Sequence, residues 1–213
     1  MLQHVYERAS LARYLTKVIV ATDDERIYDA ARSFGAQVQM TRMDHRSGTD
    51  RVAEVASADT AEVIVNIQGD EPLIDPTAID AAVLALTSDT ELPMATLSKR
   101  IEDSSEVDNP NVVKLVSDLR GNAIYFSRCA IPHRGAAHYK HVGLYVYRRE
   151  FLLAYSGLPV GPLEQAERLE QLRALENGYR VRVIETEYES LGVDTPEDLE
   201  RVTALFEPSL SKS

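Results

Sequence analysis

The sequence predicts an α/β fold whose N-terminal half contains parallel strands. Short, nearly continuous apolar segments alternate with helical patterns in the order strand, helix, strand, helix, strand. This order is typical of parallel strands joined by right-handed helical crossovers. The length of 213 residues suits one well-packed domain, expected over residues 1–206 and followed by a flexible tail at 207–213.

The N-terminal third supplies the elements of this parallel unit. Residues 2–14 carry apolar side chains on one face and are expected to form a helix. A second helix is expected over 23–35, because acidic residues occupy its first turn and a glycine ends it. A third helix is expected to begin near Gly48. The expected strands are the apolar runs at 17–22, 36–40 and 63–67.

The middle of the chain has a different pattern, which predicts a hairpin. A helix over 76–86 leads to a strand at 93–98. Residues 112–128 resemble two strands joined by an Asp-Leu-Arg-Gly-Asn turn. The strongly alternating segment 141–149 is expected to be a strand, and a short helix follows over 149–155.

Two helices and a strand complete the chain. A single helix is expected over 162–178, because a proline opens this segment and a glycine closes it. Residues 179–187 are expected to form a strand. The last helix is expected to start with Thr195 as its cap and Pro196 at its first position, with acidic residues in the first turn.

Composition and missing motifs exclude several classes of protein. The net charge of −11 argues against a nucleic-acid-binding surface. Cys129 has no cysteine to pair with inside the chain, which favours a reducing compartment, and it is expected to be a small buried hydrophobe. No membrane span or signal peptide is visible, so we expect a cytoplasmic protein. Neither GxGxxG nor GxxxxGK[ST] occurs, which disfavours a classical dehydrogenase or a P-loop kinase.

Two adjacent carboxylates follow the strand expected at 63–67. The segment Gln68-Gly69-Asp70-Glu71-Pro72 forms a turn at the carboxyl end of that strand, where ligands bind in open parallel sheets. Carboxylates at this position suit Mg²⁺, which takes few protein oxygens and completes its coordination with water and phosphate. An ordinary strand-end turn is an equally good interpretation of these residues alone.

A second acidic residue lies at another junction between a strand and a helix. Asp194 follows a strand-like run and precedes the last helix, so it is also a candidate helix cap, although Thr195 already supplies one. Asp70 and Asp194 could meet at one edge of the sheet and share a metal ion. The spacing in the sequence does not decide between these interpretations.

A polar loop before the helix expected at Gly48 is the next candidate. Arg46, Ser47, Gly48 and Thr49 offer a cation, two hydroxyls and backbone N–H groups just before a helix. Such a loop can bind a base or a phosphate. A solvated loop without a ligand is the alternative, and it is favoured if the loop is considered alone.

The remaining polar candidates lie in the C-terminal half. Arg128 follows a strand, and His141 and Tyr145 share one face of the strand at 141–149 because side chains alternate. This pair could bind sugar hydroxyls or could fill the rim of the core. Glu170 and Gln171 lie on the helix expected over 162–178, where a solvated face is the default interpretation.

Taken together, these segments resemble the 3-deoxy-manno-octulosonate (Kdo) cytidylyltransferases, also called CMP-Kdo synthetases. The resemblance covers essentially the whole chain from Met1 to about Leu205, and three of its motifs are highly specific: DHRSGTDR, QGDEP and GVDTPEDL, in that order. It implies a nucleotide-diphospho-sugar transferase fold, a Rossmann-like three-layer α/β/α arrangement with a mixed sheet. It also implies the reaction of CTP with Kdo to give CMP-Kdo and pyrophosphate, for lipopolysaccharide synthesis, and a homodimer.

The resemblance also implies site residues. Asp70 and Asp194 match the family's catalytic positions that hold Mg²⁺. The loop of Arg46, Ser47, Gly48 and Thr49 matches the nucleotide side. The positions that match the Kdo side are Gln68, Arg128, His141, Tyr145, Glu170 and Gln171.

The chain departs from the family in two places. Family members begin with a strand and a basic loop that holds the CTP phosphates, whereas Met1 here corresponds to the start of the following helix. The chain is therefore expected to be truncated at its N-terminus, to expose an edge where a central strand is missing, and to be catalytically weak or inactive. The loop between Ile131 and His141 is also shorter than usual, and Arg134 is the candidate to replace its basic contact.

Two alternatives stay open. One is a related cytidylyltransferase that acts on another sugar acid, such as sialate, although the segments around Tyr145 and Gln171 favour Kdo. The other is a non-catalytic remnant, which the missing basic loop supports and the intact QGDEP and GVDTP motifs oppose.

Overall fold

The computed structural model describes residues 1–193 and 195–210, with side chains described as far as Phe206. Most of the expected helices and strands are present, with ends shifted by a few residues. Their order is α1 (Leu2–Ala9), β1 (Ile19–Thr22), α2 (Glu25–Ser33), β2 (Gln37–Met40), α3 (Gly48–Ser57), β3 (Val63–Asn66), α4 (Pro76–Thr87), β4 (Met94–Arg100), a 3₁₀ turn (Ser104–Glu106), β5 (Lys114–Ser117), β6 (Ala123–Ser127), β7 (Tyr139–Arg148), α5 (Arg149–Tyr155), α6 (Pro162–Glu167), α7 (Leu172–Glu176), β8 (Val181–Glu185) and α8 (Pro196–Leu210).

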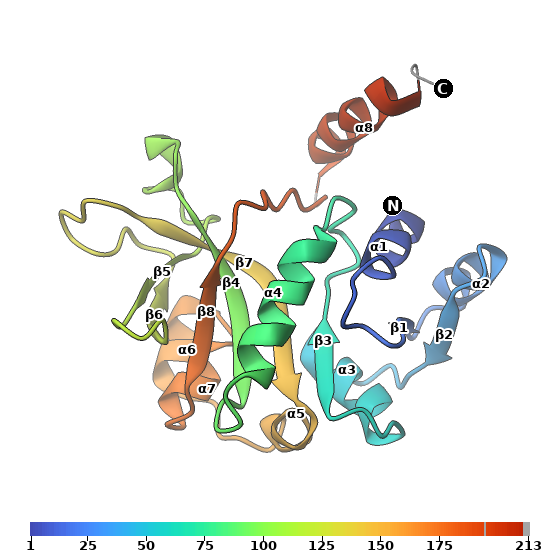
Figure 1. Cartoon of the computed structure of the whole chain (residues 1–213), viewed down its shortest axis with the longest axis horizontal. Coiled ribbons are helices and arrows are strands. Elements are labelled where there is room, and N and C mark those ends of the chain that lie inside the picture. The colour runs from blue at the N-terminus through green and yellow to red at the C-terminus, as the bar shows by residue number, and fades with distance from the viewer. Residues whose placement is uncertain (194, 211–213) are drawn as a thin grey trace.

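A six-stranded mixed sheet forms the centre of the molecule (Figure 1). The long strand β7 is antiparallel to β4 on one side. On its other side, the N-terminal part of β7 pairs with β5 and the C-terminal part pairs with β3, again antiparallel. Strands β4 and β8 are parallel. The sheet is therefore mixed, as the family resemblance implies.

The expected parallel unit is only partly formed. Strands β1 and β2 pair in parallel, with Ile19 opposite Gln37, but they form a separate two-stranded sheet. Strand β3 joins the large sheet through β7 and does not pair with β1. A cavity of about 440 Å³ lies between β1 and β3. The open edge expected from the family resemblance is confirmed, because no strand in the described part of the chain pairs with the facing edges of β1 and β3.

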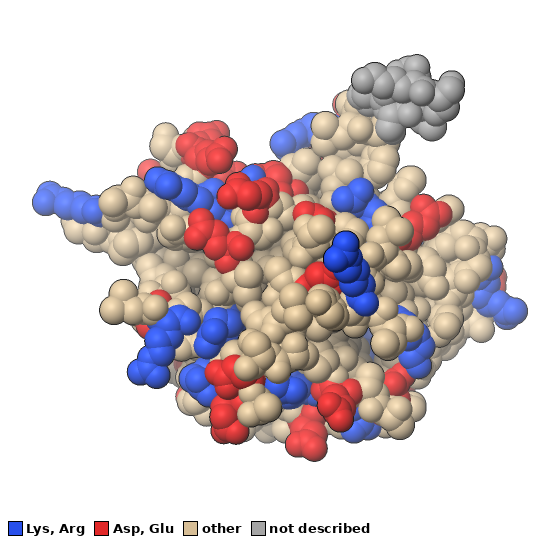
Figure 2. All heavy atoms as spheres, viewed as in Figure 1, with Lys and Arg blue, Asp and Glu red and all other residues tan. Residues whose placement is uncertain are grey.

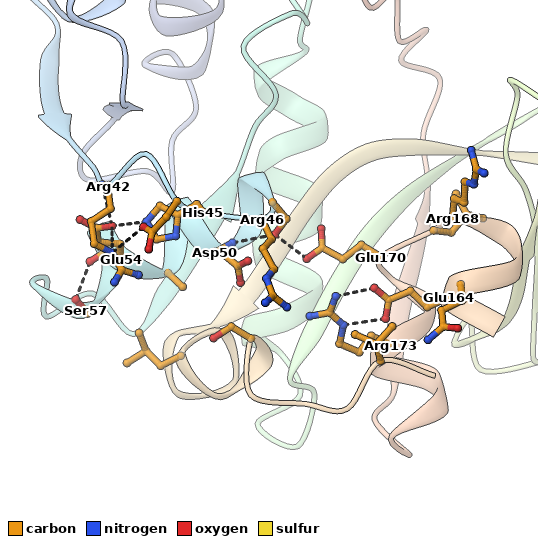
Figure 3. Close-up of a pocket in the computed structure, with 18 residues that line it drawn as sticks. Arg42, His45, Arg46, Asp50, Glu54, Ser57, Glu164, Arg168, Glu170 and Arg173 are labelled. Atoms are coloured by element: carbon orange, nitrogen blue, oxygen red, sulfur yellow. Dashed lines mark hydrogen bonds and ion pairs between the residues drawn. The ribbon is translucent and has the colours of Figure 1, made fainter. Parts of the chain in front are cut away.

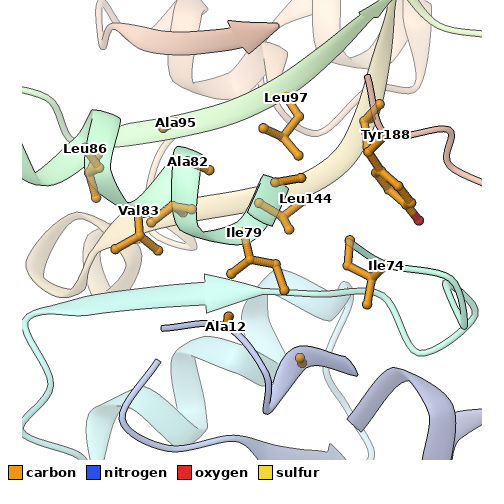
Figure 4. Close-up of a cluster of buried hydrophobic side chains, with 14 of the residues drawn as sticks. Ala12, Ile74, Ile79, Ala82, Val83, Leu86, Ala95, Leu97, Leu144 and Tyr188 are labelled. Atoms are coloured by element: carbon orange, nitrogen blue, oxygen red, sulfur yellow. The ribbon is translucent and has the colours of Figure 1, made fainter. Parts of the chain in front are cut away.

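Helices cover both faces of the large sheet. Side chains of β7 alternate, so Leu144 and Val146 pack under α4 with residues such as Ile79 and Leu97 (Figure 4). Tyr147 belongs to a second buried cluster, on the opposite face, which includes side chains of α3, α5 and α7. The two clusters make the three layers that are visible in Figure 1. His141 and Tyr145 lie on the second face, as the alternation predicts, with ring centroids 5.3 Å apart.

Residues 162–178 form two helices rather than the single helix that the sequence predicts. Helix α6 ends at Glu167. Its C-cap residue, Arg168, has a left-handed φ of 54°, and α7 begins at Leu172. The break is closed by a backbone hydrogen bond from Leu169 N–H to the Glu164 carbonyl oxygen (3.3 Å). It turns Gln171 inward, where it is 4% exposed. The expectation of a solvated face is therefore wrong for Gln171, because a continuous helix does not form.

The C-terminal helix begins as predicted and continues further than expected. The backbone N–H of Asp198 donates to Thr195 Oγ1 (3.2 Å), so Thr195 caps α8. The helix extends to Leu210 and includes residues 207–210, which are expected from the sequence to begin a flexible tail. The rest of that tail, residues 211–213, lies outside the described residues.

The surface carries charges of both signs. Figure 2 shows acidic and basic side chains interspersed over the face that it presents. Among the described helices, none is both long and apolar enough to cross a lipid bilayer.

Candidate active site

The two carboxylates after β3 have different surroundings. The Tyr188 hydroxyl donates to Glu71 Oε2 (2.8 Å), and the Ser190 hydroxyl donates to Glu71 Oε1. Burial raises the pKa of Tyr188, and the adjacent Glu71 carboxylate adds to this effect. Glu71 therefore fastens the segment that leads into α8 onto the turn after β3. Of the two adjacent carboxylates, Glu71 therefore has a structural role, and Asp70 is the candidate for the active site.

The same contact region brings the two predicted metal-binding segments together. The backbone N–H of Val193 donates to the Asp70 carbonyl oxygen at 3.0 Å. Asp194 follows Val193 directly but lies outside the described residues. In the part of the chain that is described, no group of three or more His, Cys, Asp or Glu side chains is arranged to hold a metal ion. A carboxylate that works with substrate phosphates fits Mg²⁺, which needs only one or two protein oxygens.

Two side chains of β7 and one from the residue just before α7 meet on the second face of the sheet. The Tyr145 hydroxyl donates to Gln171 Oε1 at 3.2 Å. The His141 ring is tilted by 38° against the Tyr145 ring and makes an edge contact with Phe126, with ring centroids 5.3 Å apart in both pairs. Burial lowers the pKa of His141 to about 4 and raises the pKa of Tyr145. Both side chains are therefore neutral near pH 7.

Glu170 connects this group to the polar loop before α3. The hydroxyls of Ser47 and Thr49 donate to the two oxygens of its carboxylate, at 3.2 Å and 3.3 Å. Ser47 also caps α3, because its Oγ accepts the backbone N–H of Asp50 (3.1 Å). Burial raises the pKa of Glu170. The predicted nucleotide-side loop and the predicted sugar-side helix thus meet at Glu170.

A cavity of about 850 Å³ opens beside this contact (Figure 3). One wall is the loop that carries Arg46 and Ser47, and the opposite wall includes Glu170 and Arg173. Arg46 is exposed, and its side chain extends toward Arg173 in Figure 3. Arg173 is held by Glu164 through two hydrogen bonds of 2.8 Å and 2.6 Å. The cavity is polar on both sides and is large enough for a nucleotide-sized molecule.

Arg128 is fixed by neighbours on several sides. Its backbone N–H donates to Glu167 Oε2 (2.8 Å), and its Nε donates to the Glu167 carbonyl oxygen (2.8 Å). The buried Lys114 ammonium donates to the Arg128 carbonyl oxygen at 2.6 Å. A rigid position suits a residue that binds a substrate group. The neighbouring Cys129 is exposed rather than buried as expected, because it follows the end of β6.

Gln68 lies apart from the group around Glu170 and lines the cavity of about 440 Å³ between β1 and β3. Gly48 also lines that cavity, although its neighbours Ser47 and Thr49 both hydrogen-bond Glu170. The structure therefore joins Ser47, Thr49 and Glu170, joins Tyr145 to Gln171, and places Gln68 in a separate cavity.

Some residues that position this site escape prediction from the sequence. Thr96, fully buried on β4, lies 2.8 Å from His141 Nε2 and also donates to the Leu144 carbonyl oxygen (2.8 Å). Lys114 and Glu167 fix Arg128, as described above. A polar residue inside an apolar strand, such as Thr96 in MATLS, is the signal that could have identified one of them.

Comparisons with known proteins agree over nearly the whole chain. The cytidylyltransferase family model matches residues 1–186. The 3-deoxy-manno-octulosonate cytidylyltransferase of Solibacter usitatus (strain Ellin6076) is 72% identical over 215 residues, which cover 99% of this chain and 85% of that protein. The protein of the same name from Syntrophotalea carbinolica (strain DSM 2380 / NBRC 103641 / GraBd1) is 54% identical and matches 96% of this chain and 87% of its own length.

Solved structures show the same similarity. The structure of a CMP:2-keto-3-deoxy-manno-octonic acid synthetase complexed with CTP superposes with a TM-score of 0.94 at 44% identity, covering 98% of this chain and 88% of that chain. The 4-diphosphocytidyl-2C-methyl-D-erythritol synthase of Anaerococcus prevotii DSM 20548 shares the fold at 14% identity, with a TM-score of 0.65 and coverage of 97% and 88%.

Proposed function

We propose that this chain, which belongs to the family of 3-deoxy-manno-octulosonate cytidylyltransferases, transfers CMP from CTP to Kdo and releases pyrophosphate. The observation that carries this proposal is the 72% identity to the Solibacter usitatus protein of that name over 99% of this chain. The 0.94 TM-score to a synthetase complexed with CTP supports CTP as the nucleotide.

The proposed reaction is an in-line displacement. The anomeric hydroxyl of Kdo attacks the α-phosphorus of CTP and loses its proton to solvent as the new phosphorus–oxygen bond forms. The bond between the α-phosphorus and the bridging oxygen breaks, and pyrophosphate leaves with its electrons. No covalent intermediate with the protein is needed. Catalysis of this kind depends on positioning the two substrates and on neutralising the charge that develops on the phosphate oxygens.

Mg²⁺ is the proposed cofactor, held by Asp70 and Asp194. When bound, the ion would neutralise phosphate charge and orient the oxygens around the α-phosphorus. The backbone hydrogen bond between Val193 and Asp70 supports a shared site, because it places the two segments side by side. Glu71 would hold that arrangement through Tyr188 and Ser190.

The sugar-side residues are proposed to bind Kdo around the Tyr145–Gln171 pair. His141 and Tyr145 are neutral and offer hydrogen bonds to hydroxyl groups, whereas Arg128 supplies a fixed cation. Glu170, held by Ser47 and Thr49, would connect sugar binding to the loop on the nucleotide side. Gln68 completes the proposed sugar side from the turn after β3, and Arg46 and Gly48 complete the nucleotide loop.

The family resemblance also supports the setting of the reaction. We propose that CMP-Kdo made by this chain serves lipopolysaccharide synthesis in the cytoplasm, and that the protein acts as a homodimer.

A pyrophosphate-release assay with CTP, Kdo and Mg²⁺ tests the proposed function. The Solibacter usitatus protein is the positive control, and N-acetylneuraminate replaces Kdo in a parallel reaction. The assay uses this chain and one extended upstream to include the family's basic loop. We expect release with Kdo at least from the extended chain, loss of that release on Asp70→Asn, and no loss on Asp29→Asn, an exposed carboxylate on α2. If neither folded chain releases pyrophosphate while the control does, the proposed activity is wrong. Faster release with N-acetylneuraminate would reassign the sugar acid.

A further inference from the structure

The strand pair β4–β7 is irregular next to His141. The register shifts between Thr96 and Leu97, so that Thr96 is opposite Tyr145 while Leu97 is opposite Val142. Two residues of β7, Gly143 and Leu144, are therefore accommodated as a bulge. Bulges of this kind re-aim side chains and are common beside active sites.

The hydroxyl of Thr96 lies at this bulge and makes two short contacts. It is 2.8 Å from the carbonyl oxygen of Leu144 and 2.8 Å from Nε2 of His141. A carbonyl oxygen can only accept a hydrogen bond, and a hydroxyl has a single hydrogen to donate. The hydrogen of Thr96 must therefore point at Leu144, since otherwise two acceptor oxygens would face each other at 2.8 Å.

This arrangement determines what the imidazole ring must do. Because the Thr96 hydrogen is used, the contact with His141 requires a hydrogen on Nε2, which donates to the threonine oxygen. In a neutral ring, Nδ1 then carries a lone pair and acts as an acceptor. No protein group among the described residues hydrogen-bonds to Nδ1 of His141. Burial, which lowers the pKa of His141 to about 4, is consistent with a neutral ring.

We propose that Thr96 is a positioning residue that fixes the Nε2–H tautomer of His141, so that Nδ1 accepts a hydrogen bond from a hydroxyl group of the sugar substrate. The ring itself is held in place by Phe126 and Tyr145, which pack against it from β6 and β7. A carboxylate has no hydrogen to donate to Nδ1, so His141 binds a hydroxyl group, and other residues bind the carboxylate of the sugar. The substrate part of this inference rests on the proposed function, and the tautomer does not.

Nitrogen-15 NMR of the ligand-free protein with labelled histidines tests the tautomer directly. Long-range proton–nitrogen correlations at pH 7 distinguish protonated from unprotonated ring nitrogens, and His141→Gln identifies the signals of His141 by their loss. We expect protonated Nε2 and unprotonated Nδ1. A ring protonated on Nδ1 alone, or on both nitrogens, would overturn the proposal. This measurement uses the unaltered chain, so it decides the matter even if a Thr96 variant fails to fold.

Two variants of Thr96 test its positioning role. Thr96→Val has the same shape but no hydroxyl, and Thr96→Ser keeps the hydroxyl. We expect Thr96→Val to give a mixture of tautomers and to raise the KM for Kdo roughly fivefold, the effect of losing about one hydrogen bond, with the KM for CTP unchanged. Thr96→Ser should retain both properties. An unchanged tautomer in folded Thr96→Val, or an equal rise in both KM values, would refute the role of Thr96.

Kdo analogues that each lack one hydroxyl identify the hydroxyl group that donates its hydrogen bond to His141. One analogue should bind weakly to the unaltered protein, and Thr96→Val should weaken its binding little further. If every analogue loses the same additional affinity in Thr96→Val, the hydroxyl contact is wrong. If the protein binds no sugar acid while NMR shows the Nε2–H tautomer, the proposed function fails and the assignment of the tautomer stands.

Discussion

Glu71→Ala should destabilise the fold, even though the adjacent Asp70 is the candidate site residue. The substitution removes the acceptor for the Tyr188 and Ser190 hydroxyls. Tyr188 is 8% exposed, so water cannot readily replace the carboxylate as its partner. The segment that leads to α8 would lose its attachment to the turn after β3.

The expected magnitude follows from these two hydrogen bonds. A hydrogen bond to a charged group contributes about 1.5 to 3 kcal/mol, and the two share one acceptor, so we expect a loss of about 3 kcal/mol in the free energy of unfolding. For a chain of this size, that loss lowers Tm by roughly 6 to 12 °C. Glu71→Gln should cost less, because one acceptor oxygen remains.

Urea and thermal unfolding measure the effect, with Glu62→Ala as the matched control. Glu62 is an exposed glutamate whose replacement should change stability by less than about 0.5 kcal/mol. A double-mutant cycle of Glu71→Ala with Tyr188→Phe should give a coupling energy of about 1 to 2 kcal/mol. A loss below about 1 kcal/mol for Glu71→Ala, or no coupling, would refute the assignment of Glu71 as the residue that holds this segment.

Three further predictions concern the candidate site and the helices beside it. The pKa of His141 is about 4 in the folded state and about 6.5 when unfolded, so the unfolded state takes up the proton first and stability falls as pH decreases from about 7 toward 4. Urea unfolding at pH 5 to 7 should show a slope of up to about 1.4 kcal/mol per pH unit, reduced in His141→Gln. Arg173→Met should cost about 3 kcal/mol in the same assay, because Glu164 is left buried without its cation; adding Glu164→Leu should recover most of the loss, and no recovery would contradict the pairing. Arg168→Gly should raise the free energy of unfolding by about 0.5 to 1 kcal/mol in thermal unfolding, because glycine adopts the left-handed φ of 54° without the steric cost of a side chain. A loss of stability would show that the Arg168 side chain stabilises the break between α6 and α7.

Local signals in the sequence predict much of the fold. Helix α3 begins at Gly48 and α8 at Pro196, as expected, because Ser47 and Thr195 are caps that act within a few residues of themselves. The β5–β6 hairpin also forms where the turn residues predict it. The alternation of β7 correctly places His141 and Tyr145 on one face.

Features that depend on distant residues escape this kind of prediction. Arg168 has a left-handed backbone without being glycine or asparagine, so the break between α6 and α7 has no local signal. The pairing of β3 with β7 joins residues far apart in the chain, and the bulge at Thr96 arises only once β4 and β7 are paired. The contact between Ser47 and Glu170 likewise exists only in the folded molecule. The position of Asp194, outside the described residues, stays a prediction.

Backbone groups, as well as side chains, line the cavity between β1 and β3. In the described part of the chain, each of these strands pairs along one edge and leaves the other edge open toward the cavity. Open strand edges present rows of backbone N–H and C=O groups that can pair with a further strand. An extended segment that enters this cavity would therefore be bound through its backbone, with little dependence on its side chains.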